Sequence, residues 1–220
     1  MTRIHVAPYG CLTTRMLHLA AFGNTGFCMG KYTHSLKTLR DIALEYGRVE
    51  HPDLASMARE LGRVVHLDAS ALPTRLATMH RRRRNGGRWL LAECRQPALR
   101  VLVRAWPPGE RMPLLDHADR WGLELALHGA LEWQSYRRDP HNGELDAQGR
   151  SWLGPGDANW FERDAGLAHR CRNLSRHDTA YTLHVYGGEL PDHRSGEPCE
   201  DVPVWLARVR RGTLASQLAP

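Results

Sequence analysis

Two histidines, His117 and His169, each follow a short turn in the sequence. A Pro-Pro-Gly turn at 107–109 comes before His117, and a Gly-Pro-Gly-Asp turn at 154–157 comes before His169. Segments in which apolar and polar residues alternate flank both units. Histidine is the side chain that most often binds metal ions or carries protons near neutral pH. These two positions are therefore the first candidates for a functional site.

A second group of polar residues lies in the last alternating segment. Thr182, His184 and Tyr186 are separated from one another by single residues. Because successive side chains of a strand point to opposite faces, these three share one face. The spacing predicts a row of hydrogen-bonding groups. The row faces either a functional site or a core in which the hydroxyl groups are satisfied.

The segments that must position these residues fall into two classes. Helical spacing of apolar residues predicts helices at 35–47 and 51–61, the second closed by Gly62, and a third short helix between 68 and 80. After the glycines at 86–87 the period becomes that of strands. Many short strands behind a helical prefix predict a mainly β fold, either a barrel or a sandwich. We expect strands at 89–93, 99–106, 122–128, 130–137, 158–162, 167–172 and 179–186.

The composition is that of a globular protein. The 220 residues suit one domain with a helical prefix, and they contain no run of about 18 apolar residues that could cross a membrane. The five cysteines are scattered without a C-x-x-C pair, which predicts reduced thiols in a cytoplasmic protein. The net charge is +6, and part of it comes from an arginine run at 81–84. We interpret this run as a solvated face and expect no nucleic-acid or membrane partner.

The two turn-histidine units and the last strand together resemble the cysteine dioxygenase-like (thiol dioxygenase) cupins of bacteria. The resemblance extends over residues 35–190. It implies a cupin, which is a double-stranded β-helix or jelly-roll barrel, with an N-terminal helical prefix. The residues that carry it are 106–129, 154–157, 169–173 and 182–188. The expected organisation is an extension at 1–33, poorly ordered, a helical prefix at 34–85, a barrel at 86–190 and a tail at 191–220.

The resemblance implies a cofactor. Members of the family hold ferrous iron with three imidazoles, two from an H-x-H pair and one from the second unit. On this chain those positions are Leu115, His117 and His169. A leucine cannot coordinate a metal, whereas iron sites of this kind use three facial ligands and leave positions open for substrate and O2. The Fe(II) site is therefore weakened or needs a replacement ligand.

Glu124 is the candidate replacement. In the family the position of Gly122 faces the pocket, so strand alternation places Glu124 on the inward face too. Arg104 likewise lies at a position that resembles an apolar pocket residue. Glu124 could complete a metal site with the two histidines, although it lies roughly 6.6 Å along the strand from Gly122. Alternatively it could pair with Arg104, because an unpaired buried charge is costly. We favour the pair with Arg104.

The resemblance also implies roles for the remaining polar residues. Thr182, His184 and Tyr186 are similar to the Ser-His-Tyr relay of thiol dioxygenases, in which the tyrosine hydroxyl lies beside bound thiolate and oxygen. Arg88 resembles the arginine that binds the substrate carboxylate, a task suited to a planar guanidinium. Gly122 stands where some members carry a cysteine bonded to the tyrosine, so Tyr186 is expected to have no such partner.

The leading functional hypothesis is a non-haem Fe(II) thiol dioxygenase. It would oxidise a small thiol, such as cysteine or a mercapto acid, to its sulfinate with O2. One alternative is a degenerate cupin, with weak or no metal, that binds a small anionic or zwitterionic ligand through Arg88, Arg104 and Tyr186. Another is an enzyme whose metal site is rebuilt around Glu124. The oligomeric state is not fixed by the sequence.

Overall fold

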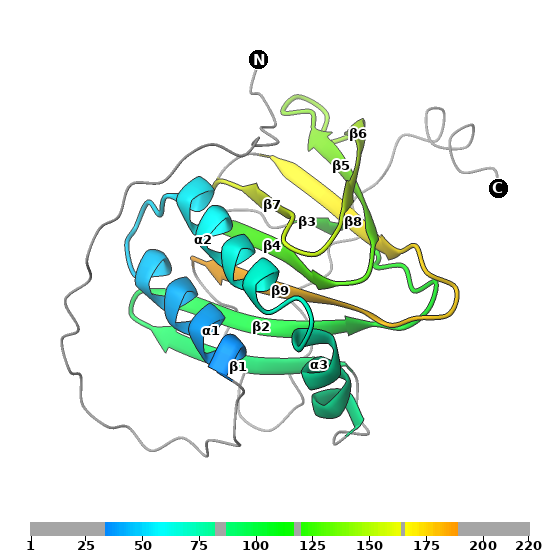
Figure 1. Cartoon of the computed structure of the whole chain (residues 1–220). Helices are drawn as coiled ribbons and strands as arrows, with labels where there is room; N and C mark the ends of the chain where they lie inside the picture. The colour runs from blue at the N-terminus through cyan, green and yellow to red at the C-terminus, as the bar shows by residue number, and fades with distance from the viewer. Residues whose placement is uncertain (1–33, 82–86, 117–119, 164–165, 189–220) are drawn as a thin grey trace, which may run out of the picture. The chain divides into compact units, whose positions relative to one another are not determined.

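The fold consists of three helices followed by two antiparallel sheets. A computed structural model describes residues 34–81, 87–116, 120–163 and 166–188, and all of them belong to one compact unit, Tyr32–Pro220. The helices are α1 (His34–Gly47), α2 (Leu54–Leu67) and α3 (Leu72–Arg81). The mainly β fold behind a helical prefix is thus confirmed (Figure 1). The predicted extension at 1–33 and tail at 191–220 lie outside the described residues, and the domain boundaries stay predictions.

The strands form two sheets that share an interior. One sheet has the order β1-β2-β9-β4-β7 and the other the order β3-β8-β5-β6. A cluster of buried apolar residues joins the two, because it combines Trp106 and Ala126 of the first sheet with Trp133 and Cys171 of the second. The strands are β1 (Arg88–Arg95), β2 (Ala98–Trp106), β3 (Leu115–Asp116), β4 (Trp121–His128), β5 (Leu131–Arg138), β6 (Leu145–Leu153), β7 (Ala158–Phe161), β8 (Leu167–Asn173) and β9 (Ala180–Gly187).

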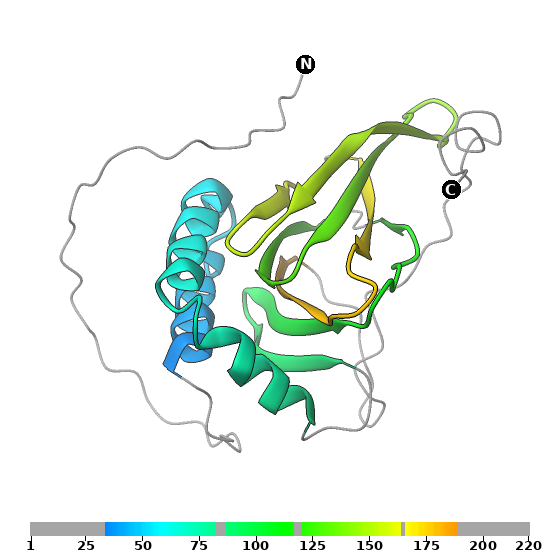
Figure 2. The ribbon, with the colours of Figure 1, turned by 45° about the vertical axis from the view of Figure 1, so that its right-hand side comes forward.

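Strand alternation assigns the two faces of the first sheet to different neighbours. On β4, Leu123, Leu125 and Leu127 pack into the core that contains the helices. The residues between them, Glu124 and Ala126, point the other way, and Ala126 belongs to the interior cluster shared by the sheets. Helices α1 and α2 contact β2, β4 and β7, and in Figures 1 and 2 they lie outside the ring of strands. The interior is therefore lined by residues of both sheets, together with Met112 of the segment after β2.

Helix α2 differs from its prediction at both ends. It begins after Asp53, whose side chain accepts a hydrogen bond from Ser56 N, as expected of an N-cap. It does not stop at Gly62 but continues to Leu67. A Cβ at Gly62 would lie 2.7 Å from the carbonyl oxygen of Gly156. This glycine therefore allows the helix to pack closely on the 154–157 turn rather than ending the helix.

Two strands escaped the sequence-based prediction. Strand β3 has only two residues, and β6 lies at the edge of its sheet, next to β5 alone. Most side chains of β6 are exposed or half-buried. An edge strand exposed in this way lacks the apolar alternation by which a strand is recognised. Within the described ranges, no helix is both long enough and apolar enough to span a bilayer.

Asn173 fastens the end of β8 to the end of β2. It is fully buried, and its Nδ2 donates to the carbonyl oxygens of Trp106, Pro107 and Asp178 at 2.9, 3.1 and 2.8 Å. Its Oδ1 accepts from Ser175 N at 3.0 Å. One amide group thus satisfies backbone groups from two loops.

We predict that Asn173→Ala lowers the free energy of unfolding by about 1–3 kcal/mol, because it leaves buried carbonyl groups without donors. Urea unfolding at neutral pH measures the loss. The exposed Asn142, in the loop between β5 and β6, supplies the control, and Asn142→Ala is expected to change the stability by less than about 0.5 kcal/mol. Equal losses for the two variants would contradict the anchoring role.

Candidate functional site

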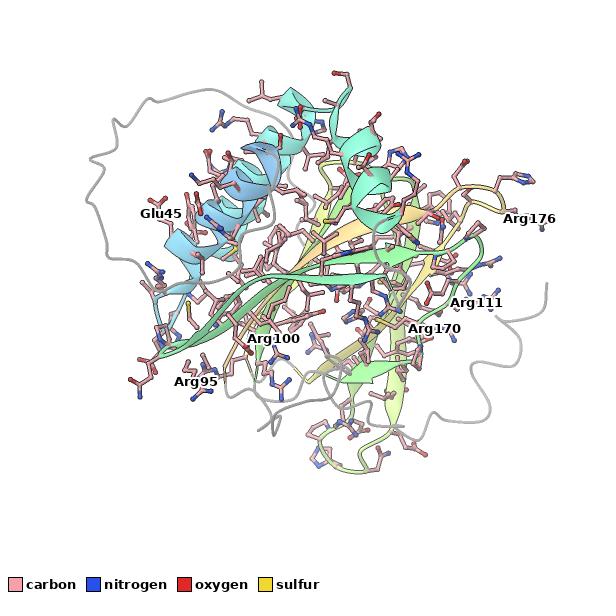
Figure 3. The ribbon with its side chains drawn as sticks, turned by 90° about the horizontal axis from the view of Figure 1, so that it is seen from below. Glu45, Arg95, Arg100, Arg111, Arg170 and Arg176 are labelled. Carbon is pink, nitrogen blue, oxygen red and sulfur yellow. The ribbon has the colours of Figure 1, made fainter. Side chains whose placement is uncertain are left out.

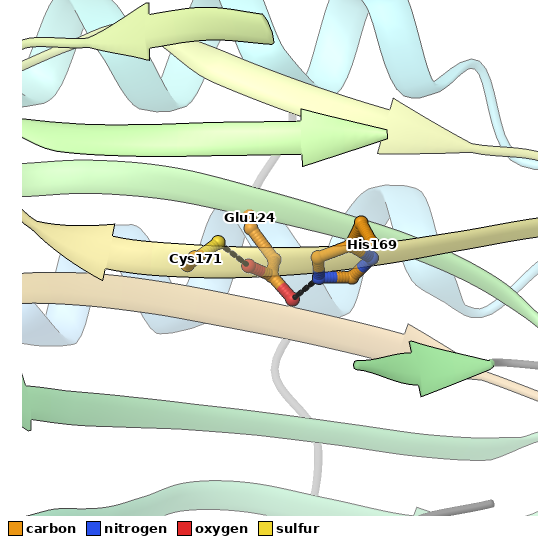
Figure 4. A group of neighbouring side chains, drawn as sticks. All are labelled: Glu124, His169 and Cys171. Atoms are coloured by element: carbon orange, nitrogen blue, oxygen red, sulfur yellow. Dashed lines mark hydrogen bonds and ion pairs between the residues drawn. The ribbon is translucent and has the colours of Figure 1, made fainter. Parts of the chain in front are cut away.

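The candidate site is built around Glu124, whose side chain is 1% exposed in the barrel interior. On β4, Glu124 lies directly opposite His184 of β9. Its carboxylate reaches across the interior to the second sheet, where His169 and Cys171 of β8 meet it (Figure 4). The inward orientation predicted from alternation is therefore what the structure has.

Four side chains surround the carboxylate. The Tyr186 hydroxyl donates to Oε1 at 2.6 Å, and His169 Nε2 lies 3.1 Å from the same oxygen. His184 Nδ1 is 3.2 Å from Oε1 as well. On the other side, Cys171 Sγ donates to Oε2 at 3.7 Å. A buried carboxylate needs this number of partners, because an ionised group taken out of water without them is very costly.

These contacts set the pKa of Glu124. Burial by itself raises the pKa, but the charges and hydrogen bonds of His184 and His169 outweigh it and hold the pKa well below its usual value. Glu124 is therefore an anion in the interior at neutral pH. It accepts hydrogen bonds from the buried side chains that surround it.

A line of hydrogen bonds runs from Trp106 to this carboxylate. Trp106 Nε1 donates to Thr182 Oγ1 at 2.8 Å, and Thr182 Oγ1 lies 2.6 Å from His184 Nε2. His184 Nδ1 lies 2.7 Å from the Tyr186 hydroxyl. That hydroxyl gives its only proton to Glu124, so Nδ1 must carry the proton that joins it to Tyr186. Nε2 of the same ring meets Thr182, so the line of hydrogen bonds leads from Trp106 to the carboxylate of Glu124.

The same carboxylate keeps its two acidic neighbours protonated. Burial raises the pKa of the Tyr186 hydroxyl well above its usual value, and the charge of Glu124 raises it further. Burial and then Glu124 act in the same direction on the pKa of the Cys171 thiol. In both cases the positive charge of Arg104 is a smaller, opposing influence. Tyr186 and Cys171 are therefore hydrogen-bond donors in this arrangement.

His169 is held by aromatic side chains. Its ring stacks on Trp133 with a centroid separation of 3.7 Å and an interplanar angle of 11°, and the ring of Phe161 lies 5.9 Å away. Directly opposite His169 on β3 is Leu115, so the two side chains point to the same face. The position expected for the lost ligand is thus adjacent to His169, and an apolar, buried leucine occupies it.

The residues present decide which metal site fits. A three-imidazole site does not, because Leu115 offers no donor atom. His117, the other predicted ligand, lies outside the described residues. Among the described residues, Glu124, His169 and Cys171 bring an oxygen, a nitrogen and a sulfur within 4.8 Å of one another. Ligand atoms bonded to one ion at about 2.1 Å lie roughly 3 Å apart when they are at right angles. The 3.1 Å between Glu124 Oε1 and His169 Nε2 fits this spacing.

Arg104 does not pair with Glu124, and that prediction was wrong. Its Nη2 donates to Glu110 Oε1 at 3.3 Å and its Nη1 to Met112 Sδ at 3.2 Å. The guanidinium also lies over the ring of Trp106, 3.9 Å from its centroid. Glu110 and Met112 lie in the segment after β2, beyond the reach of strand alternation. His169 and Tyr186 replace Arg104 as the partners of Glu124.

Arg88 is the opposite neighbour of Arg104. The register of β1 and β2 pairs the two residues directly, so both side chains project from the same face of the sheet. Trp89 and Val103, the next pair, belong to the core on the helix side. The face of Arg88 and Arg104 is therefore the one that also bears Thr182 and Tyr186.

Gly122 makes room for two aromatic rings at the site. A Cβ there would lie 2.3 Å from Phe161 Cζ and 2.8 Å from Tyr186 Cδ1. A cysteine at this position would not fit without moving one of the rings. Cys171, on another strand, places a thiol in the interior instead. Sequence reasoning missed it, although it lies two residues from His169 on one strand and alternation alone predicts that they share a face.

Five arginines of the described residues lie on two sides of the barrel. In Figure 3, Arg95 and Arg100 lie on one side of the barrel, whereas Arg111, Arg170 and Arg176 lie on the other. Arg100 binds Glu93 at 2.5 Å, and Arg170 binds Gln134 at 2.6 Å. The arginine run at 81–84 lies mostly outside the described residues. The absence of a nucleic-acid partner stays a prediction.

In metal-free protein, we predict that Glu124→Gln lowers the free energy of unfolding by about 1–3 kcal/mol at neutral pH. The folded-state pKa of Glu124 is depressed, so its ionised form stabilises the protein above the unfolded-state pKa and this contribution is lost as the pH falls. The gap between wild type and Glu124→Gln therefore narrows below about pH 4.

Urea unfolding between neutral pH and about pH 3 tests this prediction. Glu132→Gln is the matched control, since Glu132 lies on β5 and faces Arg150 at 3.8 Å outside the interior. A gap for Glu124→Gln that stays constant across the pH range would show that Glu124 is not an anion in the folded state.

Several solved structures are similar to this chain. The cupin domain of Cnp3 from Schizosaccharomyces pombe is 12% identical with a TM-score of 0.38, and the match covers 46% of this chain and 60% of that one. KdgF from Halomonas is 17% identical with a TM-score of 0.37, covering 48% and 80%. A protein from Bacillus halodurans is 17% identical with a TM-score of 0.40, covering 53% and 81%. This chain thus spans less than two thirds of the Cnp3 domain.

A family model supplies the closer assignment. The model described as cysteine dioxygenase type I matches residues 75–195, which is more than half of the 220 residues. The matched region contains all the described strands and the buried group around Glu124. The predicted resemblance is confirmed, and the fold is a cupin. This chain belongs to the cysteine dioxygenase type I family.

Proposed function

We propose that this protein is a thiol dioxygenase that binds Fe(II) in the barrel interior and oxidises a small thiol to its sulfinate. One observation carries the proposal: the carboxylate of Glu124 lies 3.1 Å from His169 Nε2, beside the position where Leu115 replaces a ligand. In the reaction both atoms of O2 are transferred to the thiol sulfur. The four electrons come from that sulfur, so no external reductant is needed.

The residues that would hold the iron are His169 and Glu124, together with His117, which stays a prediction from the sequence. Two imidazoles and one carboxylate form a facial set that leaves positions open, which is the donor set of many non-haem iron oxygenases. When bound, Fe(II) would supply adjacent sites for thiolate and O2. To bind it, His169 Nε2 gives up the proton that it shares with Glu124, because a metal ligand must offer a lone pair.

Tyr186 would act on the reacting oxygen. Its hydroxyl is fully protonated at neutral pH, since burial and Glu124 raise its pKa. His184 fixes the orientation of the hydroxyl through the hydrogen bond from Nδ1, and Thr182 and Trp106 fix His184 in turn. The proton on Tyr186 Oη is therefore available as a directed donor.

Arg88 and Arg104 would bind the carboxylate of the substrate. They project from the face that also bears Tyr186, and Arg104 already exerts its charge on Tyr186 and Cys171. A guanidinium has more N–H groups than Arg104 uses for Glu110 and Met112, so it can donate to further oxygens. A small mercapto acid fits this combination of cationic and metal-binding groups.

The decisive experiment combines metal analysis with oxygen uptake. Protein from iron-supplemented cells is expected to contain stoichiometric iron and to consume O2 when given cysteine or 3-mercaptopropionate. Glu124→Ala should weaken iron binding at least 10-fold, because a ligand is lost. Glu132→Ala, outside the interior, should leave iron and O2 uptake unchanged.

Protein without iron and without thiol-dependent O2 uptake would contradict the proposal. It would favour the alternative of a cupin that binds a small anionic ligand without redox chemistry. In that case Glu124 would keep its hydrogen bonds with His169 and Tyr186 while the protein carries out its function. Binding of an anionic ligand that is lost in Arg104→Gln would then identify the alternative.

Restoring the missing histidine gives an independent test. Leu115 is the direct cross-strand neighbour of His169, so an imidazole at 115 reaches the same metal ion. We predict that Leu115→His tightens Fe(II) binding by roughly 10–100-fold. Metal titration followed by dialysis measures the change. Unchanged metal affinity would show that position 115 is not a ligand position.

A further inference from the structure

We propose that Cys171 is a thiolate ligand of the metal ion, so that the centre combines sulfur, nitrogen and oxygen donors. The inference rests on the proposed function, because it requires a metal ion between His169 and Glu124. Cys171 has no role in the three-imidazole site of the family. The observation behind it is the convergence of the three donor atoms in the barrel interior (Figure 4).

The geometry is that of a ligand set with small adjustments. A thiolate bonds to such ions at about 2.3 Å, and nitrogen or oxygen ligands at about 2.0–2.2 Å, so neighbouring ligand atoms lie roughly 3–3.7 Å apart. Cys171 Sγ is 3.7 Å from Glu124 Oε2, and His169 Nε2 is 3.1 Å from Glu124 Oε1. All three donor atoms lie within 4.8 Å of one another. A shift of about 1 Å or less therefore closes the set around one ion.

The placement of the ligands on the strands supports the same conclusion. His169 and Cys171 are alternate residues of β8, so they project side by side from one rigid strand. Glu124 approaches from β4 in the other sheet. Each of the three side chains is buried, and Trp133 stacks on His169 so that its ring is held in place. A site made of packed strand residues is more rigid than one made of loop residues.

The chemistry of Cys171 is consistent with this role. The thiol already interacts with Glu124 through a proton, and a divalent ion would take the place of that proton between sulfur and oxygen. A thiolate is a soft ligand, and together with an imidazole it selects transition ions over Mg²⁺ and Ca²⁺. Sulfur thus adds a third donor to the oxygen of Glu124 and the nitrogen of His169.

Cobalt reports directly on the ligand. Co²⁺ added to the full-length, metal-free protein at one equivalent is expected to give the intense near-ultraviolet absorption of a thiolate-to-cobalt charge transfer. In Cys171→Ser this absorption should disappear while the remaining cysteines stay in place. Cys94→Ser is the matched control, because Cys94 lies on β1 against the helix-side core and should leave the absorption unchanged.

The outcomes separate this inference from the proposed function. Cobalt that binds wild type and Cys171→Ser with the same affinity and no charge-transfer band overturns the sulfur ligand but leaves the metal centre intact. Absence of cobalt and iron binding in wild type overturns both. A band that is lost in Cys171→Ser, with affinity lowered at least 10-fold, supports the sulfur ligand.

Discussion

The cost of burying one carboxylate governs the interior of this barrel. Glu124 is 1% exposed, and an ionised group in such a place is tolerated only when hydrogen-bond donors surround it. The donors come from both sheets: Tyr186 and His184 from β9, and His169 and Cys171 from β8. The hydrogen-bond donors that this one carboxylate requires thus connect the two sheets at the place where the chemistry is expected.

That requirement also fixes the direction of the protons. Tyr186 gives its proton to Glu124, so His184 must present the proton of Nδ1 to Tyr186, while its Nε2 meets Thr182. Trp106 lies at the other end of this line of hydrogen bonds, and its indole N–H can only donate. The orientation of the tyrosine hydroxyl therefore depends on residues of three strands. A substitution of any one of these residues would alter the hydrogen bonds that orient the Tyr186 hydroxyl.

The sequence predicted those parts of the site that follow from strand periodicity. Alternation placed Glu124 in the interior and put Thr182, His184 and Tyr186 on one face, and both expectations match the structure. It could not supply the partner of Arg104, because Glu110 belongs to the irregular segment after β2. Nor does apolar patterning reveal an edge strand such as β6, whose side chains mostly contact water. Strand periodicity predicts which side chains share a face of the sheet. The partner of a side chain in a loop segment is fixed only when the chain has folded.

Exchanging an imidazole for a carboxylate changes the electrostatics of a metal centre. With Glu124 as a ligand, a bound Fe(II) centre carries one positive charge less than it would with three neutral imidazoles. A thiolate substrate is then attracted less strongly by the ion itself. Under the proposed function, Arg104 and Arg88 would offset this loss, because they project from the face that bears Tyr186. Glu124 and Arg104 thus have compensating effects although they are not in contact. The carboxylate would lower the charge of the metal centre, and the guanidinium would supply positive charge where an anionic substrate would lie.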